Sequence, residues 1–179
     1  MCLFATHNAG LMRIRTLEPS DVQLFHSFRL RGLRENPEAF GSTFAEESVM
    51  PAEARRSRFH CTDENFVLGA FGEDGRLIGV AGFYRETHLK LRHKGFVWGM
   101  YVAPESRGGG VGRALLTSLI GRVKSLPGLE QLGLDVVTAN QAARGLYLSQ
   151  GFQIYALERE AMKQDGEYYD VEHMVLRLD

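Results

Sequence analysis

The residues best suited to bind a charged ligand form a glycine-rich segment, residues 107–113, which reads Arg-Gly-Gly-Gly-Val-Gly-Arg. An apolar, β-branched and aromatic run precedes it and ends at Pro104, and Val111, Leu115 and Leu119 recur every four residues. This pattern predicts a strand, a glycine-rich turn and an amphipathic helix. Glycines let successive N–H groups converge, and a helix start adds unpaired donors and a positive dipole end. The chemistry indicated is binding of a phosphate or pyrophosphate.

The glycine spacing separates the motifs that share this chemistry. A Walker loop requires Gly-Lys-Ser/Thr, whereas Gly112 is followed by Arg113 and Ala114. The dinucleotide fingerprint Gly-x-Gly-x-x-Gly also fails, because neither Gly-x-Gly pair has a glycine three residues further on. The segment fits Arg-x-x-Gly-x-Gly, at Arg107, Gly110 and Gly112. A nucleotide-hydrolysing enzyme is therefore disfavoured.

Two motifs together carry a resemblance to a known family. Residues 107–112 resemble the acetyl-CoA-binding motif of the GNAT superfamily (Gcn5-related N-acetyltransferases), Gln/Arg-x-x-Gly-x-Gly/Ala after a strand. Residues 140–152, Asn-Gln-Ala-Ala-Arg-Gly-Leu-Tyr-Leu-Ser-Gln-Gly-Phe, resemble the family's other signature, Asn-x-x-Ala-x-x-Leu-Tyr-x-x-x-Gly-Phe. Both occur in the usual order and separation. The resemblance implies a single-domain α/β GNAT-like fold with a mixed, mostly antiparallel central sheet flanked by helices.

The resemblance also implies an enzyme, an N-acetyltransferase that uses acetyl-CoA as co-substrate. A thioester is already an activated acyl donor, so a primary amine of a small molecule or protein would attack it directly. The pantetheine is expected to pair with main-chain groups of the central strand, and the pyrophosphate to lie over the turn. The residues that the resemblance assigns to acetyl-CoA are Met100, Tyr101, Val102, Arg107, Gly108, Gly109, Gly110, Val111, Gly112, Arg113, Asn140, Ala143 and Tyr147.

Two side chains are candidates for proton transfer. Tyr147 occupies the family's Leu-Tyr position, where the phenol commonly lies beside the CoA sulfur, so it is the expected acid; otherwise it is a helix tyrosine that packs. The glutamate that many relatives carry on the central strand is absent from residues 96–102. Asp135 stands five positions before Asn140, where another branch places an acidic residue, and could take the amine proton through a water. A solvent-facing or arginine-paired aspartate is equally compatible.

The remaining candidates concern the acceptor and the oxyanion. If Asp135 is not the base, Glu46 and Glu47 are reserves, and an amine bound neutral needs no base. A backbone N–H near Met100 is expected to stabilise the oxyanion. The expected substrate-binding residues are Glu46, Tyr84 and Tyr168, with Tyr169 as a further aromatic candidate, although strand aromatics often only pack.

Composition limits the partners and the location. The chain has 179 residues and a formal net charge of −1, so nothing in its overall charge favours nucleic acid or an anionic membrane. Cys2 and Cys61 give neither a disulfide framework nor a zinc site, and no metal is expected. No run has the length of a membrane span and no signal peptide is recognisable, which predicts a cytoplasmic protein. Relatives often pair, so a homodimer is compatible with the resemblance.

The periodicity predicts the elements that position these residues. Residues 1–11 are expected to be a tail and residues 12–179 one N-acetyltransferase domain. Ser20 and Gln23 form a potential capping box for a first helix ending before Pro37, and a second helix is expected over Glu46–His60 with Pro51 near its start. The other expected elements are strands at 12–17, 65–71, 76–84, 132–137, 152–155 and 168–178, a hairpin turn at 72–75, a second turn around 163–166, and helices from Gly112 to near Pro127 and after Asn140.

One rival belongs to another class. The same motifs would serve a CoA-binding module without turnover, acting as a sensor or partner protein. The intact Tyr147 argues against that alternative, and the missing central-strand glutamate leaves it open.

Overall fold

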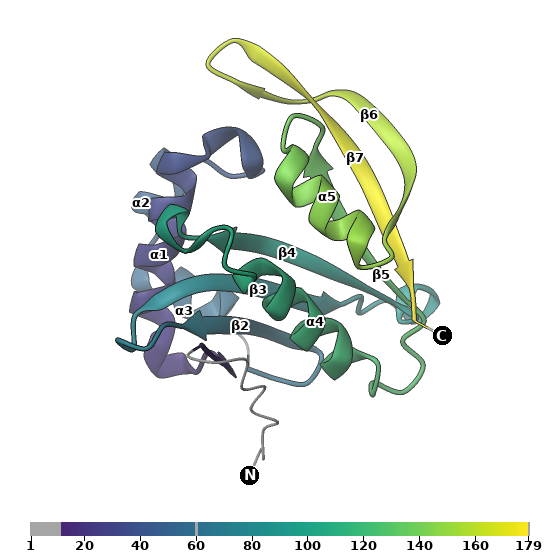
Figure 1. The fold of residues 1–179 in the computed structure, drawn as a ribbon, viewed down its shortest axis with the longest axis horizontal. Helices are drawn as coiled ribbons and strands as arrows, with labels where there is room; N and C mark the ends of the chain where they lie inside the picture. Colours follow the sequence, from purple (N-terminus) through teal and green to yellow (C-terminus); the bar gives the residue numbers. More distant parts are fainter. Residues whose placement is uncertain (1–11, 60, 179) are drawn as a thin grey trace.

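The computed structural model describes residues 12–59 and 61–178, so the predicted tail, residues 1–11, lies outside the described residues (Figure 1). Its strands form one seven-stranded sheet with the order β1-β2-β3-β4-β5-β7-β6. Every neighbouring pair is antiparallel except β4 and β5, which are parallel, and the predicted mixed sheet is confirmed. The strands are β1 (Arg13–Thr16), β2 (Asn65–Phe71), β3 (Leu77–Arg85), β4 (Lys94–Val102), β5 (Gln131–Val137), β6 (Gln153–Gln164) and β7 (Glu167–Arg177).

Helices cover both faces of this sheet (Figure 1). Successive β2 residues belong to different cores: Phe66 packs with Leu115 and Leu119 on one face, and Val67 packs with Phe28 on the other. Alternation along a strand therefore divides the apolar residues between two layers. The helices are α1 (Val22–Glu35), α2 (Phe44–Ser48) and α3 (Ala52–Arg58) on the Val67 side, and α4 (Val111–Val123) and α5 (Gln141–Ser149) on the Phe66 side.

The sheet parts in its middle. β4 and β5 pair only over Lys94–Phe96 and Gln131–Gly133, and no pairing continues beyond these residues. On its other side, β4 carries a bulge, because Trp98 faces Gly82 and Tyr101 faces Val80, which leaves one extra residue on β4. Gly99, at this bulge, has φ +61°. The second half of β4 therefore keeps β3 as its strand partner and leaves its other edge unpaired with β5.

Several local predictions were wrong in detail. The first capping box is formed by Glu18 and Asp21 around a short 3₁₀ turn, whereas Ser20 makes no cap. The predicted helix Glu46–His60 is two helices, α2 and α3, because Pro51 cannot continue a helix and instead precedes the start of α3. The strand predicted at 152–155 is part of the longer β6, which reaches Gln164.

The N-terminal cap of α5 is Asn140, the residue after which this helix is predicted. Asn140 accepts a hydrogen bond from the N–H of Ala143, at 3.2 Å from its Oδ1, which satisfies one of the free donors of the first turn. No helix among the described residues is both apolar and long enough to span a bilayer.

Candidate active site

The glycine-rich turn presents open main chain at the start of α4. Gly108 and Gly110 have φ of +79° and +80°, in the region where a side chain is strained. A Cβ built on either residue would meet no atom within 4 Å, so the space above the turn is open. Gly110 caps a helix of 13 residues without a side-chain hydrogen bond and with no acidic residue in its first turn. The turn therefore leaves unpaired N–H donors and a positive dipole end toward this space.

The two arginines of the turn differ. Arg107 donates to the carbonyl of Val102 at 3.1 Å and to Oδ1 of Asn36 at 2.8 Å, so its side chain ties the turn to α1 and lies over Tyr101. Arg113 is exposed on the first turn of α4. Main-chain groups, rather than the Arg107 guanidinium, face the open space.

A cavity of about 520 Å³ occupies the gap between β4 and β5. Among the residues assigned to acetyl-CoA, Met100, Asn140, Ala143 and Tyr147 line it. Tyr101 and Val102 do not, because the Tyr101 side chain lies on the opposite face and donates its hydroxyl to Glu35. If Tyr101 and Val102 contribute, they do so through the main chain.

Tyr147 is a buried phenol at the wall of this cavity. Its side chain is 7% exposed, its ring lies 6.0 Å from that of Phe152, and burial raises the pKa of Tyr147 to about 12. Its hydroxyl makes no hydrogen bond within the described part of the chain. The phenol therefore keeps its proton at neutral pH and has a free donor for a ligand in the cavity.

Three titratable side chains form a second feature of the same cavity. Asp135 on β5 stands opposite His173 on β7, and Oδ1 of Asp135 lies 2.7 Å from Nδ1 of His173. Nε2 of His173 lies 3.2 Å from Oε2 of Glu158 on β6. The hydrogen bond to Asp135 raises the pKa of His173, because it favours the charged imidazolium. Asp135 is half exposed and points into the cavity, on the sheet face opposite its neighbouring leucines.

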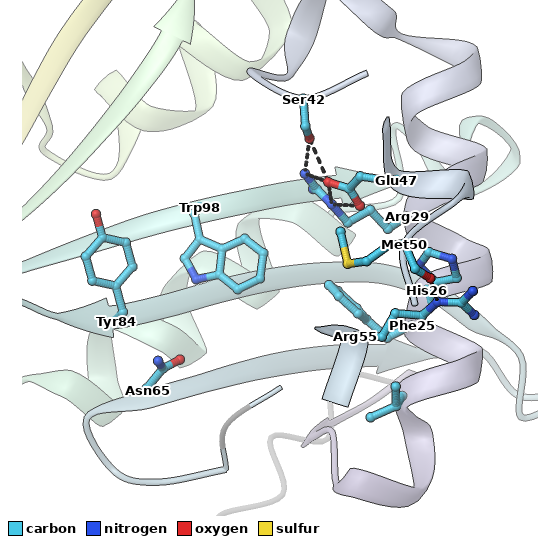
Figure 2. Close-up of a pocket in the computed structure, with 11 residues that line it drawn as sticks. Phe25, His26, Arg29, Ser42, Glu47, Met50, Arg55, Asn65, Tyr84 and Trp98 are labelled. Atoms are coloured by element: carbon cyan, nitrogen blue, oxygen red, sulfur yellow. Dashed lines mark hydrogen bonds and ion pairs between the residues drawn. The ribbon is translucent and has the colours of Figure 1, made fainter. Parts of the chain in front are cut away.

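A second cavity, of about 460 Å³, lies beside the first, under α1 to α3. Arg29, Ser42 and Trp98 line both cavities and mark their junction. The Arg29 Nε donates to both carboxylate oxygens of Glu47, at 2.9 and 2.8 Å, and Nη2 donates to Ser42 Oγ at 2.8 Å. Figure 2 shows this group on one side of Trp98 and Tyr84 on the other. We call the two spaces the cleft cavity and the side cavity.

The structure separates the expected acceptor residues. Tyr84 lines the side cavity and stacks on Phe96 at 5.7 Å, and burial raises the pKa of its hydroxyl. Glu46 does not line it, because its carboxylate is bound to Thr43 in the capping box of α2; the neighbouring Glu47 points inward instead. Tyr168 is 55% exposed on the β6–β7 hairpin and lines neither cavity.

Sequence reasoning missed several residues that line the cavities. Arg29 and Ser42 lie in segments without a motif, and His173 meets Asp135 only through the pairing of β5 with β7. Trp98 carried a usable signal, because it is the single tryptophan and lies in the strand before the turn. Among the described residues, no group of three or more His, Cys, Asp or Glu has an arrangement that could hold a metal ion.

Residues 33–152 match the model of the acetyltransferase (GNAT) family, which spans the turn, the cleft and α5. The chain belongs to this family. Membership confirms the resemblance drawn from the two motifs.

Two curated relatives match part of the chain. The uncharacterized N-acetyltransferase YoaA of Bacillus subtilis (strain 168) is 32% identical over 94 residues, 52% of this chain and 51% of YoaA. The L-amino acid N-acyltransferase MnaT of Escherichia coli (strain K12) is 32% identical over 118 residues, 66% of this chain and 63% of MnaT. The match thus spans between half and two thirds of the length of these relatives.

Solved structures share the fold over nearly the whole chain. A GNAT-family acetyltransferase from Streptococcus pneumoniae has a TM-score of 0.83 at 24% identity, covering 93% of this chain and 99% of that one. The structure of yncA from Salmonella typhimurium with its cofactor acetyl-CoA has a TM-score of 0.76 at 23% identity, covering 95% of each chain. These likenesses confirm the predicted GNAT fold.

Proposed function

We propose that this GNAT family member transfers the acetyl group of acetyl-CoA directly to a primary amine. The observation that carries the proposal is one arrangement: the parted strands β4 and β5 and the protonated phenol of Tyr147 line a single cavity, and the glycine turn with its open main-chain donors leads into α4 beside it, where Gly112 lies against Met100 of the cavity wall. A diphosphate, an extended pantetheine and an acyl sulfur require these features.

The residues present fit acetyl-CoA. Backbone N–H groups of residues 107–113 would hold the diphosphate, because the space above Gly108 and Gly110 is open and would be narrowed by side chains. The free edge of β4 beyond Phe96 would pair with the pantetheine amides, and Met100 and Asn140 line that path. When bound, the thioester supplies an activated acyl group, so the protein need not form a covalent bond to the acetyl group.

The proton transfers are assigned to two side chains. Asp135 accepts the proton of the attacking amine, directly or through a water, while His173 holds its carboxylate at 2.7 Å. Tyr147 donates its proton to the leaving thiolate, a role supported by its place at the cavity wall and by a hydroxyl that is protonated at neutral pH and has no partner among the described residues. The bulge at Gly99 turns the main chain of β4 at the junction of the cavities, where an N–H near Met100 would stabilise the oxyanion.

The acceptor enters from the side cavity, which meets the cleft cavity at Trp98. One relative, MnaT, is named for action on L-amino acids. A small amine, an amino acid, or a protein N-terminus or lysine are the classes considered for this chain. A cytoplasmic location and a homodimer remain predictions.

Two linked measurements test the proposal. Isothermal titration with acetyl-CoA should show binding, and thiol release measured against a panel of amines should show turnover with at least one acceptor. Binding without release for every amine would favour the non-catalytic CoA-binding module. Failure to bind acetyl-CoA at all would remove both functions.

A further inference from the structure

Arg29 presents one unused edge at the junction of the two cavities. Its Nε and Nη2 are bound by Glu47 and Ser42, and its side chain is only 15% exposed. Its Nη1 approaches the β4 bulge, since a Cβ built on Gly99 would lie 3.4 Å from it. Among the residues described, Nη1 donates to no partner. The guanidinium is therefore held in place by Glu47 and Ser42, with a free N–H edge beside Gly99 at the junction of the two cavities.

The side cavity beyond Arg29 is mainly apolar. Phe25 and Trp98 form one wall at 6.2 Å between rings, in an edge-to-face arrangement, and Met50 and Val22 complete it. Figure 2 shows Trp98 and Phe25 with the Arg29, Glu47 and Ser42 group beside them. At about 460 Å³ the space can hold an aromatic side chain.

The charges of this lining disfavour a cationic body. Two arginines, Arg29 and Arg55, stand against one carboxylate, Glu47, and that carboxylate is 4% exposed and already bound by Arg29 and Ser42. His26 adds no charge at neutral pH, because burial lowers its pKa. Among the described residues that line this cavity, a polyamine or aminoglycoside would find no available carboxylate, whereas an anion would find a guanidinium edge.

We propose that the acceptor is a free α-amino acid with an aromatic or branched apolar side chain, bound by its carboxylate to Arg29 and by its side chain in the side cavity against Trp98. This assignment rests on the proposed function, because it takes the cleft cavity as the site of the acetyl group. An amino acid is the smallest amine with a carboxylate and an apolar group on one carbon. Its carboxylate would meet the free N–H edge of Arg29, and its side chain would enter the apolar side cavity that Arg29 borders.

The reaction balances on this placement. The amino nitrogen forms a bond to the acetyl carbonyl carbon, and the carbon–sulfur bond of the thioester breaks. The proton lost by nitrogen goes to Asp135, and the departing thiolate takes a proton from Tyr147. Asp135 then releases its proton to solvent and the Tyr147 phenolate takes one from solvent, so the enzyme returns to its starting state with no net change in protons. The products are an N-acetyl amino acid and CoA. Pairing the carboxylate with Arg29 also reduces its attraction for the ammonium proton, which favours the neutral amine that attacks.

The single tryptophan gives a binding readout that does not need turnover. Because Trp98 is the only tryptophan and lines both cavities, its fluorescence reports directly on acceptor binding. Titrations use L-phenylalanine, L-phenylalaninamide, phenethylamine and spermidine, with and without saturating CoA, which has no acetyl group to transfer. We expect saturable binding of L-phenylalanine. The amide and phenethylamine lose a charged hydrogen bond to Arg29, so their affinities should be lower than that of L-phenylalanine by roughly tenfold or more.

The overturning results are equally specific. Binding of L-phenylalaninamide or phenethylamine as tight as that of L-phenylalanine would overturn the assignment of Arg29. Preferred binding of spermidine, or no response to any amino acid under either condition, would overturn the assignment of the acceptor class.

Variants test the residue itself. Arg29→Lys keeps the positive charge but loses the planar pair of N–H donors that can bind a carboxylate through two hydrogen bonds. Arg34→Lys, on the same helix and outside both cavities, is its matched control. Should Arg29→Lys fail to fold with Glu47 left buried, the double variant Arg29→Gln/Glu47→Gln removes both charges together. The preference for L-phenylalanine over its amide should fall to near unity in the Arg29 variants and stay unchanged in Arg34→Lys. A preference that survives in a folded Arg29 variant would overturn the proposal, and if neither folds, the wild-type ligand comparison decides it.

Thiol-release measurements distinguish a failure of the amino-acid assignment from a failure of the proposed acetyl transfer. Binding of L-phenylalanine without thiol release would retain the acceptor site and reject acetyl transfer. Thiol release with phenethylamine or a peptide N-terminus, but not with L-phenylalanine, would retain acetyl transfer and reject the amino-acid acceptor.

Discussion

The two sides of the cleft are built differently. The side assigned to acetyl-CoA comes from two continuous segments, residues 97–113 and 140–152, and relies on main-chain groups at a glycine turn and a free strand edge. The acceptor side is made of side chains from α1, α2, α3, β2, β3 and β4 and from the segments on either side of α2, and it contains a buried ion pair between Arg29 and Glu47. Main-chain donors are fixed by local backbone geometry, whereas the acceptor side depends on tertiary packing.

This difference has a physical consequence for substitution. On the acetyl-CoA side, a substitution acts through backbone strain or through one reacting side chain. On the acceptor side, a change also disturbs a partner, because removing one member of a buried ion pair leaves an uncompensated charge. The following variants test that contrast, starting with the largest expected effect.

Tyr147→Phe removes a proton donor without removing a packing group. We expect kcat to fall by about 10²-fold or more, because a positioned general acid contributes on this order. Affinity for acetyl-CoA should change little, since the ring remains and its hydroxyl has no partner among the described residues. Thiol-release kinetics and isothermal titration measure the two quantities. Tyr168→Phe, outside both cavities, is the control, and unchanged turnover in Tyr147→Phe with chemistry rate-limiting would remove Tyr147 as the acid.

Asp135→Asn removes the assigned base while keeping its shape. We expect kcat/KM to fall by roughly tenfold to a hundredfold near neutral pH and the loss to shrink at high pH, where the amine is already neutral. The pH–rate profile measures this, with Asp63→Asn, exposed and paired with Arg122, as the control. A profile that keeps its shape would transfer proton removal to Glu47 or to an amine that binds neutral.

Gly110→Ala tests the main-chain side by strain alone. Gly110 has φ +80°, so an added Cβ should cost roughly 1 kcal/mol and re-aim the N–H groups of the turn, weakening acetyl-CoA binding about tenfold. Gly121→Ala makes the same substitution in the last turn of the same helix, where a Cβ meets nothing within 4 Å, and should stabilise the fold by up to about 0.5–1 kcal/mol. Isothermal titration and urea unfolding give both values. Equal acetyl-CoA affinity in the two variants would contradict a role for this turn.

The same contrast explains what could be predicted from the sequence. The strand, the glycine turn, α4 and the Asn140 cap depend on neighbours within about a dozen residues, and these local signals sufficed. On β5, simple alternation of side chains accounts for Asp135 lying on the face opposite Leu132 and Leu134. The parallel pairing of β4 with β5, and so the cleft itself, was not predicted; the family resemblance implied only a mixed, mostly antiparallel sheet.

The acceptor side could not be predicted in this way. Arg29 and Glu47 are 18 residues apart with no pattern joining them, and His173 lies 38 residues beyond Asp135. The prediction that Glu46 binds the substrate was wrong by one position. In the five-residue helix α2, the capping box uses Glu46, and Glu47 points into the side cavity instead. No periodicity can fix the inward face of so short a helix.

The smallest expected effect concerns the two histidines of the cavities, whose pKa values shift in opposite directions. Burial lowers the pKa of His26 on the acceptor side, and the hydrogen bond to Asp135 raises the pKa of His173 on the cleft side. For His26, the unfolded chain binds the proton first as pH falls below its ordinary value near 6.5, so stability present above that pH is lost below it. For His173, the folded chain holds the proton longer, so its stabilisation is present below that pH and is lost as pH rises through the raised pKa.

Single variants separate these opposing contributions, which partly cancel in the native chain. Urea unfolding between pH 5 and 8 should show that His26→Gln loses less stability than the native protein on acidification. His173→Gln should lose less than the native protein as pH rises above about 6.5. Both effects should be smaller than those of the preceding substitutions, because each depends on a single proton. If the two variants followed the native pH dependence, neither histidine would differ in protonation between the folded and unfolded chain, and the electrostatic contrast between the two sides would be lost.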